Sequence, residues 1–514
     1  MKIHLGKVFL LFSFYVLIIS CRQQSNDYFP EPEIKSGIAR VSGKLINSGE
    51  NFEEQPELDL YYQNPFSSGR KTFTTNVQQD GTFLFEIPVE CSSLAMLSST
   101  LFYKEEDIAI GFGLIPGEET KIEMGFNEGQ ITQLNIESSI AFTLNDVKEY
   151  SNTYYKISGH IPTTNPNPEY KTFEEYVQLV LNSLERRVEI AQNEPDLSNP
   201  VKNFLTNQIR LMVLNDRLFQ YKDYMELDYR NKYPEKDRNS FELTIKPGIA
   251  DYSYLSYFNL NDPLYLYNFE YNYLMQSILW DETLNIPRIG EEPVAGWLKE
   301  VKSIMANLLG FDKGLFYDML VMNAYIRQFD NELKPLSEIQ KTNIQTYFKN
   351  NEIANVLIEQ NNKISQLDKE KNYFPLVVNE TSEIPPSQIK KTILAKYKGK
   401  NIMMDFWATW CPPCLDGIQD FQQIKPLIKE ENIVLVYIAD HSSPQEFWQE
   451  KINSIGGEHY YLSNEQSIYL SNEFELQARP TYLFFDTQGQ LQRKVVGRQE
   501  NDVMKNYINE LLGK

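Results

Sequence analysis

Two cysteines three positions apart, Cys411 and Cys414, are the residues of this chain best suited to carry out chemistry. They follow the run from Met403 to Phe406, which is apolar enough to predict a buried strand. After them, apolar residues recur at a helical interval, at Leu415, Ile418, Phe421 and Ile424. The pattern therefore places Cys411 at the N-terminus of a helix that follows a strand.

A helix N-terminus activates a thiol. The unpaired N–H groups and the helix dipole favour an anion, and they lower a cysteine pKa from about 8.5 toward the roughly 3.5–7.5 range of reactive cysteines. The resulting thiolate is a nucleophile at neutral pH. Cys414, one turn further along, can close a disulfide onto Cys411.

Three other interpretations compete with redox chemistry: a structural disulfide, a metal site and a pair of buried thiols. A tetrahedral zinc site needs four ligands, usually with a second pair at regular spacing. The other candidates are His441 and His459, which are isolated from each other, and each is more typical of a surface histidine. We therefore favour redox chemistry and predict no metal.

The run from Phe406 to Cys414 resembles the active site of thioredoxin-fold proteins, and within them of the TlpA/ResA-like, membrane-attached thiol-disulfide oxidoreductases of the bacterial envelope. The run from Ala478 to Gly489 is similar to the cis-proline, strand and turn of that family, with Pro480 at the cis-proline. The resemblance covers about residues 377–514. It implies an α/β thioredoxin fold for residues 372–514.

The resemblance also implies roles for single residues. Cys411 is expected to be the exposed attacking thiolate, and Cys414 the buried cysteine that resolves the mixed disulfide. Asp405 matches the buried acid of thioredoxins and is the candidate base for the Cys414 proton, since burial raises a carboxylate pKa. The groove for the partner's chain is expected to involve Trp407, Trp410, Pro412, Pro413, Arg479 and Pro480.

The chain departs from the family at one position. Many TlpA-like proteins carry an acidic residue three positions after the second cysteine, where this chain has Gly417. Asp405 is then the candidate for that role, and the proton pathway is left open.

The two prolines between the cysteines bear on the direction of the reaction. Neither Pro412 nor Pro413 can donate an N–H to the thiolate, so Cys414 supplies the nearest backbone donor. A less stabilised thiolate means a less oxidising disulfide, which favours a reductase. The resemblance points the same way, toward reducing protein disulfides in the envelope, sometimes during cytochrome c maturation, with a membrane electron donor and no cofactor.

Two alternatives stay open. An envelope disulfide oxidase or isomerase would use the same cysteines at a higher potential. A ligand-binding lipoprotein would use its other domains to hold a ligand and the redox module as an accessory.

The length and net charge of the chain indicate how many domains to expect and which partners to exclude. A chain of 514 residues exceeds the size at which one hydrophobic core usually stops growing, so we expect several domains. A net charge of −21 and a pI near 4.8 argue against a nucleic-acid partner, because phosphate binding needs clustered lysine and arginine.

The N-terminal sequence predicts that the protein is exported. Lys2 and Lys7 precede an apolar run over residues 8–20 that suits a signal peptide and is shorter than the roughly 20 residues a spanning helix needs. The ending Ile18-Ile19-Ser20-Cys21 resembles a bacterial lipobox. It implies a signal peptide over residues 1–20, lipid on Cys21 and attachment to the cell envelope on its periplasmic or surface side; the alternatives are an uncleaved anchor and an ordinary signal peptide. Residues 21–36 are polar and predict a tether.

Residues 37–139 predict an all-β sandwich or barrel. Strands are expected around Val41, at residues 58–62, 83–87 and 121–124, and at residues 131–136, with Asp80-Gly81 as a hairpin-type turn. Cys91 has no evident partner and predicts a lone buried thiol. The order resembles the β domain that precedes TlpA-like domains in Bacteroidota envelope proteins.

Residues 140–366 predict a mostly α-helical domain. Thr172 and Glu175 suggest a capping box, and further helices are expected after Pro200, at residues 295–309 and at residues 315–329. Residues 252–273 hold seven tyrosines. They favour an aromatic helical core, and a ligand or partner surface is the alternative.

The C-terminal region predicts a βαβ–ββα order. Strands are expected at residues 433–438, 481–485 and 491–496, and helices at residues 444–455, 467–474 and 501–512. The segment between His441 and Leu476 corresponds to the strand and helix that TlpA-like proteins add to a plain thioredoxin.

Overall fold

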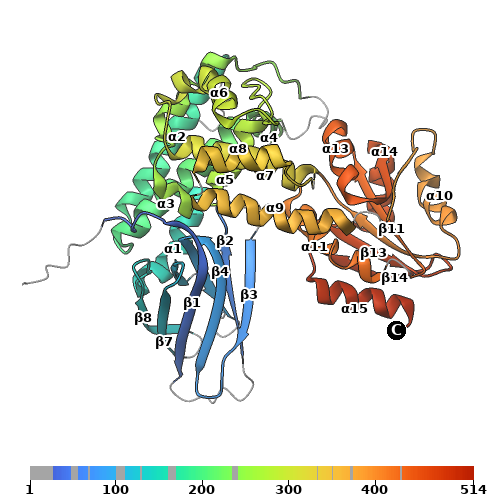
Figure 1. The fold of residues 1–514 in the computed structure, drawn as a ribbon, viewed down its shortest axis with the longest axis horizontal. Coiled ribbons are helices and arrows are strands. Elements are labelled where there is room, and N and C mark those ends of the chain that lie inside the picture. The colour runs from blue at the N-terminus through green and yellow to red at the C-terminus, as the bar shows by residue number, and fades with distance from the viewer. Residues whose placement is uncertain are drawn as a thin grey trace, which may run out of the picture.

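The computed structural model describes residues 27–47, 56–66, 70–99, 110–127, 130–159, 170–233, 241–332, 334–349, 351–370, 374–428 and 431–514. They form an N-terminal β region, a central helical region and a C-terminal α/β domain (Figure 1). Residues 1–26, which include the predicted signal peptide and Cys21, lie outside the described part.

The β region consists of two four-stranded sheets, which confirms the predicted strands. The first sheet has the order β4-β1-β7-β8, formed by β1 (Ile34–Asn47), β4 (Thr82–Cys91), β7 (Glu119–Asn127) and β8 (Gln130–Glu137). The second has the order β3-β2-β5-β6, formed by β2 (Glu57–Gln63), β3 (Arg70–Asn76), β5 (Ser93–Ser98) and β6 (Ile110–Leu114). Side chains of both sheets belong to one buried cluster, as in a sandwich. Cys91 is a free, buried thiol at the end of β4, as predicted.

The turn at Asp80-Gly81 is not a hairpin between paired strands. Gly81 has a φ of +83°, so the turn itself is present. It joins β3 to β4, but β3 pairs with β2 while β4 pairs with β1 in the other sheet. The alternating pattern of a strand predicts a buried face and does not identify the neighbouring strand.

Residues 27–36 are not a free tether. The backbone and side-chain oxygens of Asp27 accept hydrogen bonds from Asn203 and Asn199 at 2.7 and 2.9 Å. Phe29 is buried and its ring stacks on Phe142 at 6.5 Å. β1 already begins at Ile34. This segment lacks a periodic apolar pattern, so one buried aromatic residue was not enough to predict that it docks.

The central region is helical, as predicted. Its elements are α1 (Leu144–Ser158), α2 (Phe173–Asn193), α3 (Asn199–Val213), the π-helix η1 (Leu214–Phe219), α4 (Tyr221–Lys232), the 3₁₀-helices η3 (Ile249–Phe258) and η4 (Pro263–Tyr267), α5 (Glu270–Trp280), α6 (Val294–Leu309), α7 (Leu315–Glu332), α8 (Glu338–Phe348) and α9 (Glu352–Glu370). At the start of α2, Thr172 accepts from the Glu175 N–H at 3.1 Å, but the Glu175 carboxylate binds the Lys171 N–H instead of closing the capping box on Thr172. Five of the seven clustered tyrosines are buried, which confirms that they are mainly core: Tyr252, Tyr254, Tyr265, Tyr267 and Tyr271.

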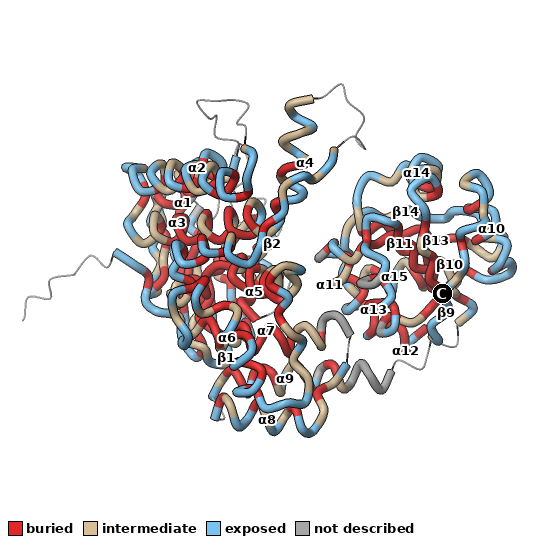
Figure 2. Tube along the Cα trace, turned by 90° about the horizontal axis from the view of Figure 1, so that it is seen from above, coloured by how far each residue is buried: buried red, intermediate tan, exposed pale blue. Residues whose placement is uncertain are grey.

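The β and helical regions share one core. A single buried cluster runs from Phe29 through both sheets to Ile364 in α9. Contacts between β1 and α9 and a bridge from Phe112 to Ala141 join the two regions directly. Figure 2 shows these buried segments as one continuous body, separate from the C-terminal domain. The boundary predicted near residue 139 therefore separates two kinds of secondary structure and does not separate two cores.

The C-terminal domain is built on a six-stranded sheet of order β14-β13-β10-β11-β12-β9. Its elements are β9 (Leu376–Asn379), η6 (Pro386–Gln388), α10 (Ile389–Lys396), β10 (Asn401–Phe406), α11 (Pro412–Phe421), α12 (Lys425–Ile428), β11 (Ile433–Asp440), α13 (Gln445–Ile455), β12 (Gly457–Leu462), α14 (Asn464–Glu473), β13 (Thr481–Phe485), β14 (Leu491–Val496) and α15 (Asn501–Leu512). The predicted strands and helices are all present. β9 and α10 were not predicted; they precede the redox strand in a segment rich in lysine and proline.

Helices cover both faces of this sheet and form two buried clusters. One cluster joins the sheet to α11, α13 and α15 and contains both cysteines. The other joins it to α10 and α14. In both views α11 lies on the side of the domain that faces the helical region (Figures 1 and 2), and α13 contacts α7.

Within the described residues, none of the helices combines the length and hydropathy that a membrane-spanning segment requires.

The docking of the N-terminal segment can be measured. Phe29→Ala removes a buried ring, so the free energy of unfolding of the β and helical body should fall by roughly 3 kcal/mol. Denaturant unfolding followed by far-ultraviolet circular dichroism checks this value. The neighbouring Tyr28 is 55% exposed, so Tyr28→Ala is the matched control and should change stability by less than about 0.5 kcal/mol. Equal effects of the two substitutions would contradict the docking.

Candidate active site

The two cysteines form a disulfide at the N-terminus of α11, as their spacing predicted. Cys411 is the N-cap residue, and its Sγ accepts a hydrogen bond from the Cys414 N–H at 3.3 Å. Pro412 and Pro413 occupy the first two helical positions and have no N–H to donate. The Cys414 amide is therefore the near backbone donor to the Cys411 sulfur.

Both sulfur-bearing residues are enclosed. Cys411 is 4% exposed and Cys414 is fully buried, so the predicted order of exposure is right but Cys411 is not an exposed residue in the disulfide form. The Cys411 sulfur is bonded to the sulfur of Cys414, a residue of α11 that belongs to the buried cluster. This bond holds Cys411 toward the core.

Asp405 lies under the disulfide because of the alternation of β10. Met403 and Trp407 belong to the buried cluster that contains the cysteines, whereas Met404 and Phe406 belong to the cluster on the opposite face. Side chains two positions apart share a face of a strand, so Asp405 points to the cysteine side. It is 3% exposed, and its Oδ1 has no hydrogen-bond partner among the described residues. Burial raises the pKa of Asp405 to about 8, against the opposing positive charge of Lys425.

Lys425 is a second buried charge that the sequence analysis missed. Its Nζ donates a hydrogen bond to the carbonyl of Ile455. Burial lowers the pKa of Lys425 to about 7, and the negative charge of Asp405 opposes that change. The available signal was a lysine within the apolar stretch from Ile424 to Ile428.

Gly417 leaves room for a tyrosine. A Cβ atom at this position would lie 2.7 Å from the Tyr482 hydroxyl oxygen, so Tyr482 takes the space that a side chain at position 417 would need. A cavity of about 10 Å³, close to the volume that holds one water molecule, is lined by Asp405, Gly417 and Tyr482 and also by Gln499 and Asn501. The departure from the family pattern at Gly417 thus coincides with a small polar opening beside the buried acid.

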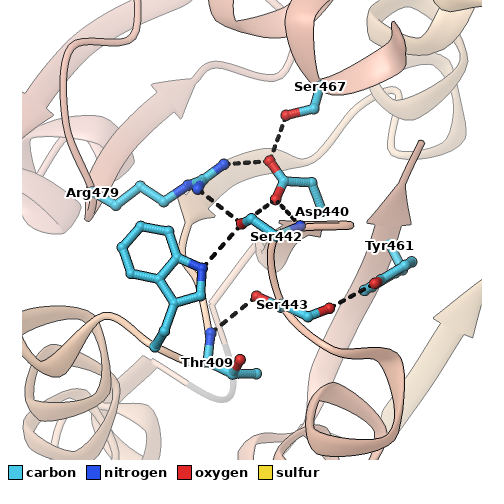
Figure 3. A network of polar contacts seen from close by, with 8 residues as sticks. Thr409, Asp440, Ser442, Ser443, Tyr461, Ser467 and Arg479 are labelled. Carbon is cyan, nitrogen blue, oxygen red and sulfur yellow. Dashed lines mark hydrogen bonds and ion pairs between the residues drawn. The ribbon is translucent and has the colours of Figure 1, made fainter. Parts of the chain in front are cut away.

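A polar network beside the disulfide ties together the loop before α11, the end of β11, α14 and the loop that carries Arg479 (Figure 3). Asp440, at the end of β11, pairs with Arg479 and accepts hydrogen bonds from Ser442 and Ser467. The Ser442 hydroxyl accepts from Trp410 Nε1 at 3.1 Å and from Arg479 at 3.4 Å. Arg479 also lies over the Trp410 ring, with its guanidinium carbon 5.8 Å from the ring centroid. The loop before α11 is therefore held against the loop that carries Arg479 and Pro480.

Asp440 is ionised within this network. Burial raises the pKa of its carboxyl, but the hydrogen bonds from Ser442 and Ser467 and the charge of Arg479 outweigh burial, so the net pKa is below its ordinary value. A second contact, from the Thr409 N–H to the Ser443 hydroxyl at 3.0 Å, fixes the same loop. Asp440 was missed in the sequence, where the signal was an acid closing the apolar run of residues 433–439.

The predicted groove residues divide into two groups. Trp410 is 57% exposed, Pro413 is exposed and Arg479 is partly exposed, so they are open to a partner. Trp407 is fully buried, and its prediction as a groove wall is wrong: it follows the alternation of β10 into the core. The Arg479–Pro480 peptide bond is cis, as the resemblance implied. The Pro412 side chain lies outside the described part of the structure.

The two histidines considered as metal ligands differ in exposure. His441 is exposed, as predicted, but His459 is fully buried on β12, which corrects its assignment to the surface. Its ring stacks on Tyr437 at 5.0 Å, and burial lowers the pKa of His459 to about 3, so it is neutral. Among the residues that the structure describes, no group of three or more histidine, cysteine or carboxylate side chains is arranged to hold a metal ion.

Comparison with known proteins places this site in a recognisable domain. Residues 389–512 match the thioredoxin-like domain family. The chain is 22% identical over 122 residues to the thiol-disulfide oxidoreductase ResA of Bacillus cereus, an overlap that covers 24% of this chain and 69% of that protein.

Solved structures align with the same region. StoA from Bacillus subtilis shares 21% identity over 22% of this chain and 84% of that chain, with a TM-score of 0.20. The pneumococcal exposed lipoprotein thioredoxin from Streptococcus pneumoniae shares 26% identity over 23% of this chain and 90% of that chain, also with a TM-score of 0.20. By the family match and the ResA overlap, the C-terminal region is a thioredoxin-like domain similar to thiol-disulfide oxidoreductases.

The raised pKa of Asp405 predicts how stability depends on pH. The folded domain holds the Asp405 proton up to about pH 8, whereas the unfolded chain loses it near pH 4, so this group makes the domain less stable as pH rises between these values. Asp405→Asn removes this loss of stability with rising pH. The variant should gain a few kcal/mol of stability over the natural protein between pH 4 and 8, at up to about 1.4 kcal/mol per pH unit, and the gain should level off above pH 8.

Denaturant unfolding of the C-terminal domain at pH 5, 6.5 and 8, followed by tryptophan fluorescence, measures this gain. Asp502→Asn is the control, since Asp502 is exposed in the first turn of α15, and this variant should show no growing gain. A difference between Asp405→Asn and the natural protein that stays constant with pH would contradict the buried, protonated state.

Proposed function

We propose that this protein is an envelope-anchored thiol-disulfide oxidoreductase that reduces protein disulfides through Cys411 and Cys414. The observation that carries the proposal is the cysteine pair at the N-terminus of α11 above a buried acid, Asp405. Similarity to ResA supports the same class of reaction.

The reaction begins with the Cys411–Cys414 pair as a dithiol. The Cys411 thiolate attacks one sulfur of the partner's disulfide, so a bond forms between Cys411 and that sulfur while the partner's S–S bond breaks. The partner's other sulfur leaves as a thiolate and takes a proton from water. The helix N-terminus and the Cys414 N–H stabilise the attacking thiolate.

The second step releases the partner. Cys414 gives up its proton to Asp405 in the ionised form of this acid, which is the minority form at pH 7, and the Cys414 thiolate attacks the Cys411 sulfur. The mixed disulfide breaks, the partner leaves as a second thiol, and the Cys411–Cys414 disulfide remains, so two electrons have passed to the partner. A pKa near 8 lets Asp405 accept and release a proton close to neutral pH. The small cavity lined by Asp405, Gly417 and the half-buried Gln499 has room for one water molecule, which would receive that proton.

The backbone donors support the proposed direction of the reaction. With prolines at the first two helical positions, the Cys411 thiolate has one near N–H donor where an ordinary helix would offer more. A weakly stabilised thiolate corresponds to a disulfide that is a poor oxidant, which favours reduction of the partner.

The Asp440 network prepares the surface that meets the partner. Because Ser442 and Arg479 hold the exposed Trp410 ring, this ring offers a fixed apolar contact beside the disulfide. The cis peptide at Pro480 orients the neighbouring loop, and Arg479 adds a positive charge to an otherwise acidic protein. A partner chain would lie between these two loops.

Lipid on Cys21 would attach the protein to the envelope, and a membrane electron donor would return the disulfide to the dithiol. The lipobox-like sequence at residues 18–21 supports the anchor. Docking of residues 27–36 onto the helical body leaves residues 22–26 between the lipid and the folded part.

The roles of the two cysteines are tested by trapping. Cys414→Ser should accumulate stable mixed disulfides between Cys411 and envelope proteins, because the resolving thiol is gone. Cys411→Ser is the matched control and should trap none. In the reduced natural protein, iodoacetamide should alkylate Cys411 first, well below pH 8. Faster alkylation of Cys414, or equal trapping by both variants, would reverse the assignment.

The role of Asp405 is tested by rates. Asp405→Asn should slow resolution of the mixed disulfide by about 10²–10⁴-fold, the usual contribution of a general base. Reduction of insulin disulfides between pH 6 and 8 measures it, with Asp502→Asn as the control that keeps the natural profile. If Asp405→Asn also kept the natural pH profile, the proton would leave by another route and Asp405 would be structural.

The anchor is tested at Cys21. Cys21→Ala should move the protein from the membrane fraction to the soluble fraction or block its processing, and mass spectrometry should show loss of the lipid. An unchanged mass and unchanged partitioning would argue against lipidation, while Ser20→Ala, which keeps the cysteine, should leave both as they are.

A further inference from the structure

A cavity of about 180 Å³ lies where the β sandwich meets the helical region, outside the thioredoxin-like domain. Its walls come from β2, β5, α1 and α3 and from the segment of residues 267–270 that enters α5. Junctions between packed regions are frequent positions for small-molecule sites. Nothing in the proposed redox reaction uses this cavity.

Half of the residues that line the cavity are aromatic. They come from both regions: Tyr61, Tyr62, Tyr150, Phe204, Tyr267 and Phe269. The rings of Tyr150 and Phe204 stack at 6.4 Å, which holds two of the walls in place. The faces of such rings carry negative charge density and attract cations.

A buried carboxylate lies in the same cavity. Glu270 is 6% exposed, and its Oε1 accepts a hydrogen bond from Gln208 Nε2 at 3.3 Å. Its Oε2 is buried and has no partner among the described residues. Burial raises the pKa of Glu270 to about 8, and the negative charge of Asp216 adds to that rise. The residues that line the cavity offer an ionised carboxylate no counter-charge, so Glu270 holds its proton at pH 7, and a bound cation would favour the ionised form.

Asn268 adds a second unsatisfied group. It is 1% exposed and lines the cavity, and neither its amide nitrogen nor its amide oxygen has a partner among the described residues. Each buried polar atom left without a hydrogen bond costs about 1–3 kcal/mol. Asn268 and Glu270, which are two positions apart in the chain, therefore each present a polar atom without a partner among the described residues to one cavity, and a ligand would satisfy both.

We infer that this cavity binds a small protonated primary amine with a short apolar body. The ammonium group donates hydrogen bonds to Glu270 Oε2 and Asn268 Oδ1 and supplies the missing counter-charge. The apolar body packs against the rings of Tyr150 and Phe204. An anion would find no lysine or arginine among the residues that line the cavity, and a quaternary ammonium ion has no N–H to donate to Asn268.

Calorimetry with n-butylammonium chloride at pH 7 tests this inference on the purified protein. The amine should bind the natural protein, and 1-pentanol, which has a similar shape and no charge, should bind at least tenfold more weakly. Glu270→Gln keeps the size of the side chain and should weaken amine binding at least tenfold. Asp405→Asn, which alters a buried acid in the other domain, should leave it unchanged.

A second variant covers failure of Glu270→Gln to fold, which circular dichroism would reveal. Met96 is half-buried at the cavity wall, so Met96→Trp should fill the cavity and abolish amine binding while Glu270 stays in place. The inference is overturned if butylammonium does not bind the natural protein at concentrations up to about 10 mM. It is also overturned if pentanol or tetramethylammonium binds as tightly as butylammonium, or if both variants bind butylammonium as the natural protein does.

Discussion

The active site depends on the burial of β10 on both faces. All six residues of this strand are buried, and it pairs with β11 on one side and β13 on the other. A strand held in this way cannot shift by one position without moving its side chains to the opposite face. It therefore fixes Asp405 on the cysteine side and delivers the chain to Cys411 at a set point above the sheet, where α11 begins.

Three buried carboxylates show how surroundings decide what an acid does. Asp440 receives several hydrogen bonds and the charge of Arg479, so it stays ionised and acts as a fixed support. Asp405 has a buried lysine nearby but an unpartnered oxygen, and its pKa lies where protons exchange. Glu270 has no cation acting on it among the described neighbours, which is the condition that a cationic ligand would relieve. The same functional group thus serves structure at Asp440, while we propose that it serves proton transfer at Asp405 and recognition at Glu270.

The division of hydrophobic cores separates two parts of the protein. The sandwich and the helices share one cluster, while the thioredoxin-like domain has its own clusters on the two faces of its sheet. Binding at the cavity near Glu270 and redox chemistry at Cys411 therefore rest on different packed bodies. Contact between α7 and α13 is where one body meets the other.

The sequence by itself predicted the cysteine pair at the N-terminus of a helix. The spacing of Cys411 and Cys414, the prolines between them and the apolar strand before them are local features, and local patterns are enough to predict a capped helix. It also predicted many of the strands and helices, because their periodicity does not depend on distant residues, but it did not predict β9 or α10. Tertiary structure alone decided the burial of Trp407 and His459, the electrostatic influence of Lys425 on Asp405, the support of Trp410 by Asp440 through Ser442 and the docking of Phe29. These features depend on which segments far apart in the chain pack together, and a local sequence pattern does not identify those segments.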